Sequence, residues 1–157
     1  MGFKGEDKEI KSVSGRKRVN INGLLNANDV TDIVTISSDT INSQSTQELY
    51  QKLIDNNPEK DKIYIICDNA RYYKNKALNE WLVNTKIVQV FLPPYSPNLN
   101  IIERLWKFLK KEVINTTFYR TFDEFKNGIS DFFKNIKNYQ DKLETLLTNN
   151  FHIKPAN

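Results

Sequence analysis

Two carboxylates stand at positions from which they could bind a divalent metal ion. Asp68 directly follows a short apolar run, within the segment IICDNARYY at 65–73. Glu103 opens an amphipathic segment, and 34 residues lie between the two acids. Carboxylate oxygens suit Mg²⁺, which keeps several waters and needs few protein ligands. The chain has one histidine and one cysteine, which excludes a zinc cluster and an internal disulfide.

Each acid also has an interpretation that involves no chemistry. Asp68 is of a residue type that caps helices, and a helix could begin just after it. Glu103 could stabilise the positive end of its own helix and pair with Lys107, four residues on. However, ligands and catalytic groups of open α/β sheets collect at the carboxyl ends of strands. The two residues alone leave both interpretations open. If each acid lies at the carboxyl edge of the sheet, Asp68 and Glu103 would converge within reach of one metal ion.

Alternating strands and helices must position these acids. Segments 19–25 and 30–42 are rich in β-branched residues and predict an antiparallel pair of strands. Helix 45–57 has Ser45 or Thr46 as its expected N-cap. The order of elements favours an α/β sheet with parallel members. The remaining expected elements are strands at 62–67 and 86–92, helices at 75–84, 101–114 and 121–136, and a helical tail from 139 to about 147.

A proline-rich connector, PPYSPNLN at 93–100, joins the last strand to the helix that carries Glu103. It could be a polyproline ligand for an aromatic groove. Its place between a strand and a helix favours a stiff brace that fixes where Glu103 points. Tyr95 would pack on this brace or stack on a base. The residues expected to shape the site are Asn69, Pro93, Pro94, Tyr95 and Asn100.

Composition limits the class of protein. A chain of 157 residues with 39% hydrophobic and 27% charged residues is typical of one globular domain. No apolar run approaches the length of about 20 residues that a membrane span needs, and no signal peptide opens the chain, so we expect a cytoplasmic location. A net charge of +4 is a weak indication of a polyanionic partner.

The segments CDNARYYKNKALNEWL and VFLPPYSPNLNIIERLWKFLKK, with their spacing of acids, resemble the DDE transposases of the mariner superfamily, specifically the bacterial insertion-sequence branch. The resemblance covers most of residues 4–125. It implies an RNase H-like fold, a mixed five-stranded sheet flanked by helices. It also implies metal-dependent DNA cleavage and strand transfer at insertion-sequence ends in the bacterial cytoplasm or nucleoid. Two Mg²⁺ or Mn²⁺ ions would be held by Asp68 as second acid and Glu103 as third, in a homo-oligomer that binds transposon ends and target DNA.

The first acid of that family lies on the opening strand, upstream of the segment that resembles KGEDKEIK. We therefore expect a single, N-terminally truncated catalytic domain at 1–157 without its opening strand. Its core would span about 15–135, with a helical tail at about 136–157. None of Glu6, Asp7 and Glu9 is expected to replace the missing acid, nor are Asp29, Asp32 and Asp39. A sheet without this strand would be marginally stable or would associate.

Cations beside the two acids predict contacts with a phosphate backbone. The expected contacts are Arg16, Lys17, Arg18, Arg71, Lys74, Lys107, Lys110 and Lys111. Tyr73 stands where family members often carry histidine, and tyrosine cannot act as a neutral base near pH 7. Two alternatives stay open. One is an inactive transposase remnant that only binds nucleic acid or a protein, and the other is an aspartate-based phosphotransfer enzyme.

Overall fold

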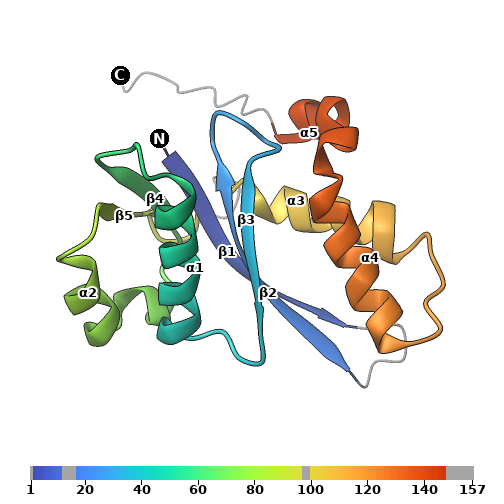
Figure 1. Ribbon diagram of the computed structural model, residues 1–157, viewed down its shortest axis with the longest axis horizontal. Helices are drawn as coiled ribbons and strands as arrows, with labels where there is room; N and C mark the ends of the chain where they lie inside the picture. Colours follow the sequence, from blue (N-terminus) through green and yellow to red (C-terminus); the bar gives the residue numbers. More distant parts are fainter. Residues whose placement is uncertain (1, 12–16, 97–99, 148–157) are drawn as a thin grey trace.

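A five-stranded sheet in the order β3-β2-β1-β4-β5 organises the protein, as a computed structural model shows (Figure 1). The structure describes residues 17–96 and 100–147 and the backbone of residues 2–11. β1 runs antiparallel to β2 and parallel to β4, so the sheet is mixed. β4 and β5 are parallel and end side by side, with Cys67 opposite Phe91. The predicted α/β class and the antiparallel pair β2–β3 are confirmed.

The strands are β1 (Gly2–Lys11), β2 (Arg18–Asn26), β3 (Ile33–Ser38), β4 (Ile63–Cys67) and β5 (Ile87–Phe91). The α-helices are α1 (Ser43–Asn56), α2 (Lys76–Leu82), α3 (Ile102–Leu109), α4 (Phe122–Lys134) and α5 (Gln140–Leu147). Shorter helical turns are η1 (Arg71–Lys74), η3 (Lys110–Ile114) and η4 (Ile136–Tyr139).

β1 corrects the expectation that the sheet lacks its opening strand. Residues 2–11 form the central strand, between β2 and β4. Their sequence, GFKGEDKEIK, has no apolar alternation to mark a strand. The strand forms because its backbone pairs along its length with β2 and at its start with β4. Pairing on both sides satisfies backbone groups that an open sheet would leave exposed.

Helices cover both faces of the sheet (Figure 1). On one face, α1 and α2 pack over Leu24, Val34, Ile63 and Ile65, and we call this cluster the α1-side core. On the other face, α3, α4 and α5 pack over Val19, Ile21 and Leu25, and we call this cluster the α3-side core. Successive residues of β2 contribute to opposite cores, as the pleat of a strand requires.

The helix boundaries follow local capping. Asn42, rather than Ser45 or Thr46, caps α1, because its side chain accepts the Ser45 N–H at 2.9 Å. The Ser45 hydroxyl accepts the Asn42 N–H in return, which completes a capping box. α3 continues into a wider π-helical turn, η3, in which the Asn115 N–H donates to the Lys110 carbonyl at 2.9 Å.

The core extends beyond its expected limit at about residue 135. Ile136, Leu143 and Leu147 are buried in the α3-side core. Leu143 is fully buried, so α5 is packed as closely as the helices before it. The helical segment after α4 therefore belongs to the packed domain as far as residue 147.

Candidate active site

The carboxyl ends of β4 and β5 are bound tightly to each other. The Leu92 N–H donates to the Cys67 carbonyl at 2.8 Å and prolongs the pairing by one residue. The Asn69 side-chain amide donates to the Leu92 carbonyl at 2.9 Å. Lys74 donates to the Asn69 side-chain oxygen at 3.0 Å and lies over the Phe91 ring, 5.0 Å from its centroid. These contacts hold the segment after each strand in a fixed place.

Asp68 stands at this junction, half-buried, directly after β4. Its Oδ1 accepts the Ala70 N–H at 2.8 Å, which closes an Asx turn and fixes the carboxylate. The capping alternative is wrong, because η1 has no side-chain cap and α2 is capped by Asn75. Within the described chain Asp68 has no other hydrogen bond or ion pair, so Oδ2 is open to a ligand.

Glu103 lies half-buried in the first turn of α3. The position of this helix is set by Gly23 on β2, since a Cβ there would lie 3.0 Å from the Trp106 ring. The close approach seats α3 on the sheet, and α3 also lies against β1. The alternative Glu103–Lys107 pair is absent, because Glu103 has no ion pair with any residue of the described chain.

Asp68 and Glu103 line one cavity of about 560 Å³ at this end of the sheet. The five residues expected to shape the site line it too, together with Lys74. Leu92 and Ser96 complete the lining. The sequence did not predict them, although they directly precede Pro93 and follow Tyr95. The cavity thus joins segments on both sides of the 34-residue spacing.

Tyr95 is the most exposed part of this cavity. Its φ of 59° is left-handed, a conformation that costs a non-glycine residue roughly 1–2 kcal/mol. Its side chain is fully exposed, so the expectation that it packs on the proline brace is wrong. The ring is free to stack on a partner, and base stacking stays a prediction.

The backbone of β1 bears on the first acid. Glu6 pairs with Gly23 of β2, and the pairing of β1 with β4 runs from Gly2 to Lys4, which pairs with Ile66. Glu6 therefore lies in the central strand of the sheet, two residues beyond the last pair with β4.

The predicted DNA-binding cations do not form one group. Lys74 lines the cavity, and Arg71 is exposed beside it in η1. Lys107 and Lys111 line a separate groove between α3 and α5, and Lys110 is exposed on η3. Lys17 lies over the Phe122 ring at 5.4 Å, and Arg18 lines a hollow beside the same ring. Arg16 is outside the described residues.

The donors present fit a hard divalent ion. Asp68 and Glu103 offer carboxylate oxygens to the same cavity, and Asn69 and Asn100 line it nearby. No three metal-binding side chains gather anywhere among the side chains that the structure describes. A complete site would thus need a further ligand.

Comparison with known proteins identifies the family. A family model described as "DDE superfamily endonuclease" matches residues 1–126. The chain belongs to the DDE superfamily endonucleases. No curated protein matches it at a significant level. The predicted DDE family is thereby confirmed, whereas the bacterial insertion-sequence branch and the roles of Asp68 and Glu103 stay predictions.

Solved structures show how this DDE endonuclease is folded. The Mos1 transposase catalytic domain with raltegravir and Mg is similar with a TM-score of 0.67 and 17% identity, over 93% of this chain and 81% of that one. The Mos1 transposase paired-end complex with left transposon end is similar with a TM-score of 0.65 and 15% identity, over 93% of this chain and 54% of that one. The HTLV-2 integrase catalytic core domain with magnesium is similar with a TM-score of 0.54 and 14% identity, over 84% of this chain and 81% of that one. The predicted RNase H-like fold of transposase and integrase catalytic domains is confirmed.

Across the described residues, no helix combines the length and the apolar character that crossing a bilayer requires.

Proposed function

We propose that this chain is the catalytic domain of a DNA transposase of the bacterial insertion-sequence branch. It would cleave phosphodiesters at the ends of its element and join them to target DNA. The observation that carries the proposal is the meeting of Asp68 and Glu103 in one cavity at the carboxyl ends of β4 and β5. Membership of the DDE endonucleases supports it. The phosphotransfer alternative does not account for Glu103.

Mg²⁺ or Mn²⁺ held by Asp68 and Glu103 would activate a water or 3′-hydroxyl and stabilise the leaving oxygen. The protein's part is to hold its own groups still. The Ala70 N–H orients the Asp68 carboxylate, and Lys74 together with the Leu92 carbonyl fixes Asn69 beside it. Lys74 also brings positive charge to a cavity that must receive a phosphate.

Glu6 is the third carboxylate in this proposal. Its support is that Glu6 belongs to the central strand β1, which pairs with β4, the strand that precedes Asp68. A glutamate reaches one methylene further than the aspartate that the family uses. Similar proteins have been solved with Mg or Mn, and one forms a paired-end complex with a transposon end. We infer that this chain likewise acts as an oligomer on DNA in the bacterial cytoplasm.

Metal-dependent nicking of DNA that carries the element's own ends tests this function. The purified chain is assayed with Mg²⁺ and with Mn²⁺, beside Asp68→Asn, Glu103→Gln and the control Asp61→Asn, an exposed acid outside the cavity. We expect nicking that both cavity variants abolish and the control retains. Mn²⁺ binding followed by electron paramagnetic resonance should weaken in the same two variants, which tests the ligands independently of turnover.

Other outcomes are equally informative. DNA binding without nicking, in a chain that also fails to bind Mn²⁺, would support the alternative of an inactive remnant. Nicking that survives both cavity substitutions would overturn the assignment of Asp68 and Glu103.

A further inference from the structure

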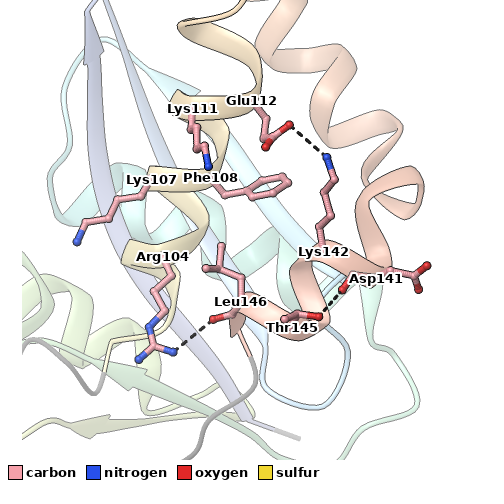
Figure 2. A pocket seen from close by; sticks show the side chains of 9 residues that line it. All are labelled: Arg104, Lys107, Phe108, Lys111, Glu112, Asp141, Lys142, Thr145 and Leu146. Carbon is pink, nitrogen blue, oxygen red and sulfur yellow. Dashed lines mark hydrogen bonds and ion pairs between the residues drawn. The ribbon is translucent and has the colours of Figure 1, made fainter.

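A second hollow lies on the outer side of α3, away from the two acids. It is a groove of about 660 Å³ between α3 with η3 on one side and α5 on the other (Figure 2). The Arg104 guanidinium donates to the Leu146 carbonyl at 3.3 Å and joins the two walls at one end. Lys142 pairs with Glu112 at 3.5 Å and joins them at the other. The groove therefore has fixed walls.

The α3 wall is positively charged. Arg104, Lys107 and Lys111 follow one another at helical spacing along it. Lys107 and Lys111 are exposed, and in the part of the chain that the structure describes neither has an ion-pair partner. Two carboxylates also line the groove, Glu112, which is occupied by Lys142, and Asp141. The cations outnumber the acids, so the groove favours an anionic occupant.

The floor of the groove is apolar and partly aromatic. Phe108 points from α3 toward α5 (Figure 2), held edge-on by Tyr139 with ring centroids 5.7 Å apart. Leu146 reaches the floor from α5 and is 39% exposed, although it is a large apolar residue. A groove that combines exposed lysines with an apolar floor suits a single nucleic-acid strand. Its phosphates would pair with the lysines, and its bases would contact the apolar floor. A duplex offers its phosphates but keeps its bases stacked inside.

One helix connects the groove with the acids. Glu103 and Lys107 are one turn apart on α3, and Lys111 is one turn further. The distance from Glu103 to Lys111 along the axis is about 12 Å. A strand with one phosphate at Glu103 would need to extend only a few nucleotides to reach the groove.

We propose that the groove between α3 and α5 binds the single-stranded DNA that flanks the cleaved phosphodiester. The inference rests on the proposed function for the choice of DNA, and on the groove itself for the single strand. Lys107 and Lys111 neutralise phosphates, while the exposed part of Leu146 offers an apolar contact to a base.

Binding measured without turnover tests the groove. Fluorescence anisotropy in EDTA compares a labelled 15-nucleotide single strand, the duplex of the same sequence and a polyglutamate peptide, each titrated with the whole chain. The variant Lys107→Gln/Lys111→Gln is set against Lys62→Gln/Lys134→Gln, which removes the same charge from exposed lysines outside the groove. We expect the groove variant to bind the single strand about tenfold more weakly. The slope of log affinity against log salt should fall by about 0.7 for each phosphate that the variant no longer neutralises.

Leu146→Gln, which changes polarity without adding charge, tests the floor separately. Because Leu146 is partly exposed, this change is compatible with folding, which circular dichroism verifies. We expect weaker binding of the single strand and little change for the duplex. Equal weakening in the groove variant and the lysine control would overturn the proposal. Loss of peptide binding with unchanged DNA binding would also overturn it, in favour of an acidic protein segment.

The two proposals can fail separately. Groove-dependent binding of the single strand by a chain that never nicks DNA would sustain the groove and remove the transposase activity. If nicking depends on Asp68 but single-strand binding is unchanged in Lys107→Gln/Lys111→Gln, the transposase activity would stand and the groove proposal would be overturned.

Discussion

At the scale of single residues, Asn69 lines the cavity beside Asp68 and joins the two strand ends that meet there. Its amide nitrogen donates to the Leu92 carbonyl and its oxygen accepts from Lys74. Both sides of this one side chain are therefore used to join the ends of β4 and β5. Asn69 thus holds in place the segment that carries Asp68, as its contacts with Leu92 and Lys74 show.

Asn69→Ala should weaken the site more than the fold. Groups that orient a metal ligand typically contribute about 10–100-fold to metal affinity or activity. We expect a loss of Mn²⁺ affinity and nicking in this range, with unfolding free energy lowered by only about 1 kcal/mol. Isothermal titration with Mn²⁺ and urea denaturation measure the two effects. Asn79→Ala, at an exposed position of α2, is the control and should change neither.

Glu6→Gln tests the third carboxylate. If Glu6 completes the site, the change should abolish nicking and weaken Mn²⁺ binding as Asp68→Asn does, because the amide keeps the shape and loses the charge. Glu9→Gln is the matched control, since Glu9 lies three residues further along β1, where it pairs with Asn20. Full activity of Glu6→Gln would refute the assignment.

At the scale of elements, α3 is positioned by the absence of a side chain. Gly23 leaves the space into which Trp106 packs, and this contact determines how closely the helix that carries Glu103 approaches β1 and β2. The sequence predicted α3 well, because its apolar residues recur at helical spacing. The sequence could not predict where α3 packs on the sheet, since a glycine inside a strand does not indicate which side chain fills the space beside it.

Gly23→Ala should displace α3. The new methyl would lie 3.0 and 3.1 Å from two ring carbons of Trp106, so ring or strand must move. We expect a loss of about 1–3 kcal/mol of unfolding free energy in urea denaturation. In a double-mutant cycle, Trp106→Phe should partly rescue Gly23→Ala, because the smaller ring frees the space. Strictly additive effects would show that the contact is not the cause.

α5 offers a test of where the domain ends. Leu143 is fully buried, so Leu143→Ala should cost about 2–5 kcal/mol. Leu146, three residues on, is 39% exposed, and Leu146→Ala should stay within about 0.5 kcal/mol. Thermal unfolding of the two variants compares them directly. A similar small effect for both would indicate that α5 is a dispensable tail.

At the scale of the whole molecule, the sheet is covered unevenly. Tyr64, Val88 and Val90 remain 36–45% exposed on β4 and β5, on the face that α3 covers further along the sheet. β5 is also an edge strand. The sequence led us to expect association of a sheet without its central strand. That strand is present, and the same expectation now rests on this apolar face instead.

Val90→Lys should shift the protein toward monomer. The change places a charge within the exposed face without disturbing the buried core, so melting temperature should hardly change. Sedimentation velocity over a range of concentrations measures the state of association. Val83→Lys, at a position 79% exposed after α2, is the control and should leave association unchanged. A wild-type chain that is monomeric at all concentrations would contradict the expectation.

Prediction from sequence succeeded where the local residue pattern determines the structure. It failed where contacts with residues distant in the chain determine it. β4 and β5 were predictable as apolar runs, and the 34-residue spacing correctly joined Asp68 with Glu103 in one cavity. β1 was missed because it is polar and depends on β2 and β4 for its conformation. Of the two roles predicted for Tyr95, packing on the prolines is wrong because the ring is fully exposed, and no propensity indicated its left-handed backbone.

The pairing of β1 with β4 has a consequence for the order of folding. β1 reaches β2 through a short connection, whereas its pairing of Gly2 with Tyr64 spans a much longer stretch of chain. Closing a long loop costs more entropy, and contacts of this kind form slowly. The antiparallel pair of β1 and β2 can thus form early, before β4 pairs with β1. The cavity lies where β4 ends, so competence to bind metal should appear only in the last phase of refolding.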